Sequence, residues 1–110
     1  MTAGGAVAYS TISEAVRRAA GAEPEETAGI VGALRAMQGV KVAVLFVETA
    51  RGIEVSIRSR DGVRANHIAE AFGGGGHGGA AGCTLSGSIQ EAVDRLLPAA
   101  EAELAIQVPP

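Results

Sequence analysis

The chain has 110 residues, 47% hydrophobic and 19% charged, which is the length and composition of one ordinary globular domain and excludes a disordered chain. Its net charge of −3 excludes a general polyanion-binding protein, and its aromatic content of 3% argues against base recognition by aromatic platforms. Because Cys83 is the single cysteine and no apolar run approaches the length of a membrane span, we expect a cytoplasmic protein without an intrachain disulfide or a membrane contact.

Two helices are expected in the first third of the chain, after a short strand at residues 6–9. Residues 11–14 (TISE) have the form of a capping box that opens a helix at Thr11. The apolar residues that follow at helical spacing are Ile12, Ala15, Val16 and Ala19. A second helix is expected to open at residues 24–26 (PEE), because proline and carboxylates suit a first turn. The buried stripe predicted for it is Ile30, Val31, Leu34 and Met37.

The middle of the chain carries the two clearest strand patterns. Residues 40–47 (VKVAVLFV) are apolar on both alternating faces apart from Lys41, which is typical of a central strand covered on both sides. Residues 53–57 (IEVSI) alternate between apolar and polar side chains, which predicts a strand with one buried face. The same period of two places Arg58 and Arg60 together on the polar face.

The last third is predicted to contain a short helix, a strand and a long helix. Asn66 is the candidate N-cap of the short helix, and a strand is expected at residues 83–85. Residues 88–91 (SIQE) form a second capping box. The helix that they open is expected to reach about Leu104, with a kink or a break at Pro98.

The resulting order is strand, two helices, two strands, helix, glycine tract, strand, helix, without an internal repeat or a long linker. This order predicts an α/β (α+β) fold, in which a small mixed β-sheet is flanked by helices. Residues 1–110 are expected to form a single domain.

The glycine tract, residues 72–82, reads FGGGGHGGAAG. A flexible linker is the plain alternative, but such a linker inside a compact chain costs entropy on folding. The tract is not a dinucleotide fingerprint, because that motif follows a strand and opens a helix. It has no lysine for a P-loop. His67, His77 and Cys83 lack the spacing of zinc ligands, and His67 is expected at the surface.

The interpretation that remains is a site for an anionic oxygen. Consecutive glycines such as Gly74, Gly75 and Gly76 leave backbone N–H groups unshielded, so a loop there can form a concave nest around an anion. His77, in the middle of the tract, adds a donor that can be neutral or charged near physiological pH.

The arginine strand next to the tract fits the same interpretation. Arg58 and Arg60 can supply the forked, charge-assisted hydrogen bonds that phosphate favours, and Ser59 can supply a hydroxyl. The simpler alternatives are that His77 only hydrogen-bonds the fold together and that Arg58 pairs with Glu54. Taken together, the residues predict an oxyanion site, most plainly for a nucleotide phosphate.

The segment GGGGHGGAAG closely resembles the GGGH-x-x-AAG signature of the DHHA1 domain, the C-terminal half of DHH-family phosphoesterases. The similarity extends to AYSTIS, GVKVAVLFVE, EVSIRSR and SGSIQEAV, and it is greatest to the nanoRNase and 3′-phosphoadenosine-5′-phosphate (pAp) phosphatase subgroup. This resemblance implies that Arg58, Ser59, Arg60 and residues 74–77 hold the phosphate of a short oligonucleotide, of a dinucleotide product such as pApA, or of pAp. The chain departs from the subgroup at residues 78 and 79, where glycine replaces a residue that is often larger or basic.

The resemblance also implies a catalytic domain and a metal that the chain does not carry. The family's reaction uses two manganese ions (Mn²⁺) held by Asp and His residues of an N-terminal DHH domain, whereas the aspartates here are Asp61 and Asp94, both remote from any histidine in motif spacing. The chain is therefore expected to be an inactive, substrate-binding fragment whose partners are nucleotides, the DHH domain of its parent enzyme and, as a further option, a second copy. The alternative hypothesis is a non-catalytic nucleic-acid-binding or oligomerisation module, like the tails of alanyl-tRNA synthetases.

Overall fold

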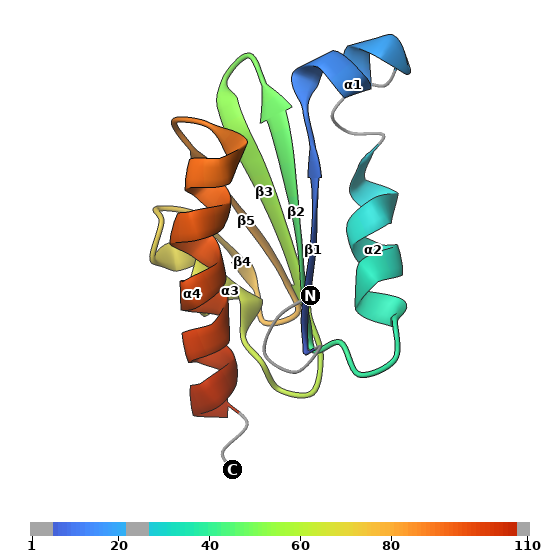
Figure 1. The fold of residues 1–110 in the computed structure, drawn as a ribbon. Helices are drawn as coiled ribbons and strands as arrows, with labels where there is room; N and C mark the ends of the chain where they lie inside the picture. Colours follow the sequence, from blue (N-terminus) through green and yellow to red (C-terminus); the bar gives the residue numbers. More distant parts are fainter. Residues whose placement is uncertain (1–5, 22–26, 108–110) are drawn as a thin grey trace.

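A computed structural model describes residues 6–21 and 27–107 as a five-stranded sheet with helices on both faces (Figure 1). The strand order is β1-β2-β3-β5-β4, with β1 and β2 parallel and every other neighbouring pair antiparallel. The mixed sheet confirms the predicted fold class. In chain order the elements are β1 (Val7–Ile12), α1 (Glu14–Ala19), α2 (Ala28–Ala36), β2 (Val42–Thr49), β3 (Gly52–Ser59), α3 (Ala65–Glu70), β4 (Gly75–His77), β5 (Ala80–Leu85) and α4 (Ile89–Gln107).

The central strand β2 separates two hydrophobic layers. Its first six residues are all buried, which confirms the strand predicted from its apolar alternation. Val42, Val44 and Phe46 point into the core beneath α3 and α4. The intervening residues, such as Leu45, contact the smaller cluster beneath α2, which contains Val31. Apolar side chains on both faces therefore fix β2 in the middle of the fold.

The start of the first helix differs from its prediction. β1 continues through Ile12, which pairs with Val47, and Ser13 is the N-cap, with its hydroxyl accepting a hydrogen bond from the Val16 N–H at 3.1 Å. The prediction of a capping box that opens at Thr11 is therefore wrong. Pairing with β2 keeps Thr11 and Ile12 in the strand, so the helix begins later. The predicted apolar stripe is wrong as well, since α1 buries no residue and Val16 is 63% exposed.

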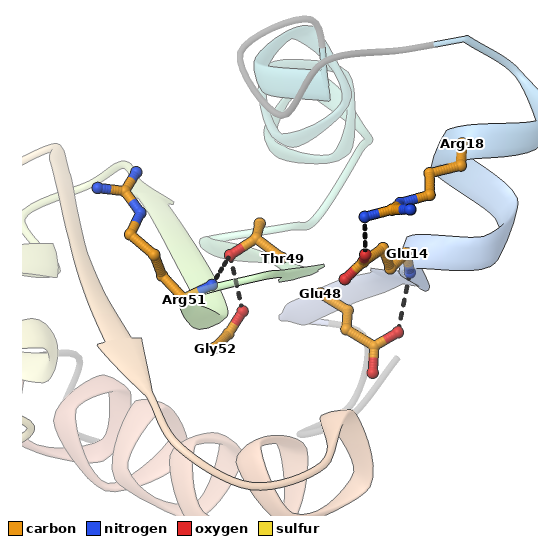
Figure 2. Close-up of polar contacts among 6 residues, drawn as sticks. All are labelled: Glu14, Arg18, Glu48, Thr49, Arg51 and Gly52. Atoms are coloured by element: carbon orange, nitrogen blue, oxygen red, sulfur yellow. Dashed lines mark hydrogen bonds and ion pairs between the residues drawn. The ribbon is translucent and has the colours of Figure 1, made fainter.

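Polar contacts fix the end of the sheet that lies next to α1 (Figure 2). The Glu48 carboxylate accepts a hydrogen bond from the Glu14 N–H at 2.9 Å, and Arg18 forms an ion pair with Glu14. In the β2–β3 turn, the Thr49 hydroxyl donates to the Gly52 carbonyl and accepts from the Arg51 N–H. These contacts organise the end of the sheet at which β2 leads into β3.

The second helix is only partly as predicted. Its expected opening at residues 24–26 lies outside the described residues, and α2 follows the N-cap Thr27. Val31 is buried and Leu34 packs against the same cluster. Ile30 and Met37, however, are 40% and 43% exposed, so half of the predicted stripe faces outward.

The helices on the opposite face also correct two predictions. Arg64 is the N-cap of α3, whereas Asn66 lies inside the helix and donates a hydrogen bond to Glu70. Of the kink or break predicted at Pro98, the break does not occur, because α4 continues through Pro98 as one helix. Pro98 is exposed, so water can solvate the carbonyl group that the missing N–H leaves without a helical partner.

The capping box predicted at the start of α4 is confirmed. The Ser88 hydroxyl accepts from the Glu91 N–H at 3.1 Å, and the Glu91 carboxylate accepts from the Ser88 N–H at 2.9 Å.

Ser88→Ala should lower the free energy of unfolding by about 1 kcal/mol in thermal unfolding, whereas Ser86→Ala, at an exposed site, should change it little. Equal effects of the two changes would contradict this role for Ser88.

The same box has a defined pH dependence. Hydrogen bonds from the Ser88 backbone and then from its side chain hold the pKa of Glu91 below its ordinary value. Because this pKa is lowered in the folded state, ionised Glu91 stabilises the fold at pH values above the ordinary glutamate pKa. This stabilisation is lost as the pH falls through the folded-state pKa of Glu91.

Candidate functional site

The glycine tract is not an open loop throughout, as the nest interpretation assumed. Gly75–His77 forms β4, which pairs with β5 in the register Gly75↔Gly82, Gly76↔Ala81 and His77↔Ala80. β4 is the last strand of the sheet, so one side of its backbone is paired with β5 and the other lies at the sheet edge. The tract therefore presents its bare backbone as an edge strand followed by a turn.

The glycines of the tract have two different structural roles. A Cβ at Gly74 would overlap the Gly82 carbonyl oxygen, and a Cβ at Gly76, whose φ is 151°, would lie 2.5 Å from the Ala80 carbonyl oxygen. These two glycines are needed for close packing of the backbone. Gly75 and Gly78 have no atom within 4 Å of an added Cβ, so their bare backbone faces open space.

The register brings His77 and Arg58 to one face. His77 pairs with Ala80, and Ala80 pairs with Arg58, so the three side chains lie in one row on the same side of three neighbouring strands. The middle residue of this row is an alanine, which leaves little bulk between the other two. The imidazole is exposed, whereas Arg58 is half-buried and its Nη1 donates to the Ile57 carbonyl at 3.0 Å.

The next row along the strands forms a low floor beside this pair. It consists of Ser56, Gly82 and Gly75, which carry small side chains or none. The helix on this face, α2, packs on β1, β2 and β3, whereas β5 and β4 pack against α3 on the opposite face (Figure 1). We call the surface formed by His77, Arg58 and this floor the open face.

Arg60 continues the arginine side of the open face. Its backbone N–H donates to the Lys41 carbonyl at 3.0 Å, which extends the β2–β3 pairing one residue beyond Ser59. The alternation therefore persists, and Arg60 lies on the side of Arg58, as its spacing predicts. The neighbouring carboxylate belongs to Asp61, which forms an ion pair with Lys41 at 2.7 Å. The hydrogen bond and charge of Lys41, with a smaller effect of Arg60, lower the pKa of Asp61.

Ser59, in contrast, is not brought to the open face. Its side chain is 4% exposed, and its hydroxyl lies within hydrogen-bond distance of the Val63 carbonyl (2.5 Å) and the Gly78 carbonyl (3.0 Å). Its N–H donates to the Gly79 carbonyl at 3.0 Å. Ser59 therefore positions the turn after His77 from the opposite side of the sheet. The sequence could have predicted this position of Ser59. The strand alternation that places Arg58 and Arg60 on one face places Ser59, which lies between them, on the opposite face.

The other polar candidates have structural surroundings. His67 is exposed, as predicted, and its Nδ1 lies 3.0 Å from the carboxylate of Glu103, a contact that joins α3 to α4. Cys83 packs against the core, and burial raises the pKa of its thiol, as expected of a small core residue. Nothing in the sequence pattern pointed to the pairing of His67 with Glu103.

Within residues 6–21 and 27–107, no three His, Cys, Asp or Glu residues are grouped in a way that could hold a metal ion. The described helices include none that is both long and apolar enough to cross a membrane.

The sheet with its glycine-rich edge strand is that of a known domain class. Residues 4–105 match the DHHA1 domain, and the chain belongs to this family. A curated relative, the bifunctional oligoribonuclease and PAP phosphatase NrnA of Thermus thermophilus, is 46% identical over 86 residues, which are 77% of this chain and 26% of that protein. The chain therefore spans about a quarter of the length of this relative.

Two solved structures share the fold. An exopolyphosphatase-related protein from Bacteroides fragilis superposes with a TM-score of 0.87 at 21% identity, over 97% of this chain and 32% of that one. The C-Ala domain of Aquifex aeolicus alanyl-tRNA synthetase superposes with a TM-score of 0.61 at 23% identity, over 84% of this chain and 88% of that one. At these identities the similarities establish the fold.

Proposed function

We propose that this chain is the substrate-binding domain of a DHH-family phosphoesterase that acts on short oligonucleotides, on dinucleotide products such as pApA, or on pAp. The observation that carries the proposal is the row His77, Ala80 and Arg58, which sets an imidazole and a guanidinium on one face beside bare backbone. The 46% identity to an oligoribonuclease and PAP phosphatase supports the same substrate class.

The chemistry of the open face suits a phosphate group. Arg58 supplies a planar, permanently charged donor, and Arg60 adds a second on the same side of the strand. His77 can donate to a further phosphate oxygen. Gly75 and Gly78 leave the backbone open, so a ligand can approach their peptide groups without meeting a side chain. In this proposal Ser59 acts indirectly, by holding the turn that follows His77.

Catalysis is assigned to a separate DHH domain of the parent enzyme, in which manganese would activate the attacking water. The residues described in this chain do not fit such a centre, because they contain no cluster of metal-ligating side chains. The role proposed for this domain is therefore to hold and orient the nucleotide. In the same proposal the parent enzyme is cytoplasmic and can form a homodimer.

The alternative, a nucleic-acid-binding or oligomerisation module of the synthetase type, rests on the likeness to the C-Ala domain. That likeness has 23% identity, compared with 46% to the phosphoesterase relative. The two proposals differ in the expected ligand, since the phosphoesterase domain should bind pAp and dinucleotides, whereas a synthetase-type module should prefer a structured RNA.

A direct test uses the purified chain with manganese and short nucleotides. We expect weak binding of pAp and pApA in isothermal titration and no manganese-dependent hydrolysis of either, measured by chromatography of the products. Turnover that persists through repeated purification would contradict the assignment of catalysis to another domain. Absence of nucleotide binding together with tight binding of a structured RNA would favour the alternative.

A further inference from the structure

Two basic residues lie opposite each other, one immediately before β2 and the other immediately after β3. Continuing the register Val42↔Ser59 by one residue places Lys41 across from Arg60, and the Arg60 N–H donates to the Lys41 carbonyl at 3.0 Å. Residues directly opposite each other in an antiparallel pair project from the same face, and like charges in such a pair repel. The pair is therefore unfavourable unless an anionic group lies nearby.

Asp61, in the turn that follows Arg60, supplies that anionic group. The Val63 N–H donates to the Arg60 carbonyl at 3.2 Å and closes the turn. Both central residues have a positive φ, 57° at Asp61 and 84° at Gly62. The Asp61 carboxylate lies 2.7 Å from the Nζ of Lys41. The backbone of the turn therefore directs the carboxylate to the lysine.

The two cations act differently on this carboxylate. A hydrogen bond from Lys41 and then its charge lower the pKa of Asp61, and the charge of Arg60 has a smaller effect in the same direction. Lys41 thus holds the carboxylate directly, and Arg60 influences it through its charge. Lys41 and Arg60 carry two positive charges and Asp61 one negative charge, which leaves a net charge of +1 in this cluster. With Lys41 bound to Asp61, the remaining positive charge lies on Arg60.

We infer that Lys41 is a positioning residue for the open face: by binding Asp61, it keeps the Arg60 guanidinium accessible to the phosphate of a bound nucleotide. Without Lys41, the Asp61 carboxylate would pair with Arg60 and compete with the ligand for it. This inference rests on the proposed function, in which Arg60 adds a second guanidinium on the side of Arg58. It assigns roles to two charged residues that act on the ligand only through Arg60.

A double-mutant cycle, measured by isothermal titration with pAp, tests the inference. Lys41→Met keeps an unbranched apolar stem and removes the charge, and Asp61→Asn keeps the turn, because asparagine tolerates a positive φ. Lys41→Met should weaken pAp binding by roughly threefold, the range expected of an exposed ion pair. Asp61→Asn alone should change the affinity little, and the double variant should bind pAp like the wild type.

The cycle separates competition for Arg60 from two simpler effects. A general loss of positive charge would make the changes additive, so that Asp61→Asn would strengthen binding equally with and without Lys41. A purely structural role would leave the loss in Lys41→Met without rescue by Asp61→Asn. Either result would overturn the inference and leave the proposed function standing. Failure of the wild-type chain to bind pAp would overturn both.

The matched control is the same pair of changes at the other end of β3. Arg51→Met and Glu54→Gln alter an exposed ion pair at 3.1 Å, and neither change should alter the affinity for pAp. A loss in Arg51→Met equal to that in Lys41→Met would mean that net charge alone sets the affinity, and it would overturn the inference.

A second measurement needs no ligand. In nuclear magnetic resonance spectra of the isotopically labelled chain, the side-chain Nε–Hε signal of Arg60 should shift in Lys41→Met, because the guanidinium then binds Asp61. The signal should return to its wild-type position in the double variant. An Arg60 signal that does not move in Lys41→Met would overturn the inference.

Discussion

Gly74→Ala should destabilise the fold strongly, whereas Gly75→Ala, one residue away, should leave its stability close to that of the wild type. An added methyl group at Gly74 would overlap the Gly82 carbonyl oxygen and lie 2.6 Å from the Cβ of Cys83. Both of those atoms belong to β5, so relief requires movement of a strand backbone. Overpacking of this kind costs about 3 kcal/mol or more. At Gly75 the same methyl group meets no atom within 4 Å.

Thermal unfolding followed by circular dichroism measures this difference. The midpoint of Gly74→Ala should fall by about 10 °C or more, and that of Gly75→Ala by no more than a few degrees. Equal midpoints for the two variants would show that β4 does not pack against β5 as described. A strong loss of stability in Gly75→Ala alone would mean that Gly75, and not Gly74, is the glycine in close contact with β5.

His77→Ala and Arg58→Ala should each weaken the binding of pAp by about tenfold, and the double variant should show no measurable binding. Each change removes a donor from the same face, and a hydrogen bond to a charged group is worth more than one between neutral groups. Neither side chain is buried, so both truncations should leave the unfolding midpoint nearly unchanged. Isothermal titration measures the affinities.

Two other residues serve as controls for this loss. Arg51→Ala removes an exposed arginine whose ion pair with Glu54 lies at the opposite end of β3, and it should bind pAp like the wild type. His67→Ala removes the other histidine, which pairs with Glu103 behind the sheet, and it should change stability more than affinity. Equal loss of binding in the controls and in the open-face variants would contradict the assignment of the site.

The periodic segments were predictable because their own residues decide their environment. Residues 42–47 are apolar at every position, and a strand covered on both faces buries them all. The alternation of β3 placed Ile57 inside and Arg58 outside, as found. The Ser88 capping box formed because its contacts are local and no strand competes for these residues.

The elements that depend on distant contacts were not predictable in the same way. β4 contains two glycines and one histidine, which have no preference for a strand, and it forms because β5 lies alongside. Thr11 carries a helix-capping signal, but β2 pairs with it and extends β1. Likewise, the glycine-nest interpretation treated the tract as one unit, whereas Gly74 and Gly76 serve packing and Gly75 and Gly78 face open space.

Binding of a nucleotide phosphate to the open face is tested most directly by the change in backbone amide chemical shifts when pAp is added to the isotopically labelled chain. We expect the largest shifts at residues 74–79 and at Arg58 and Arg60, with small shifts at residues 14–18 near the opposite end of the sheet. Unchanged shifts at residues 74–79, or the largest shifts on the α4 side of the sheet, would contradict binding at the open face.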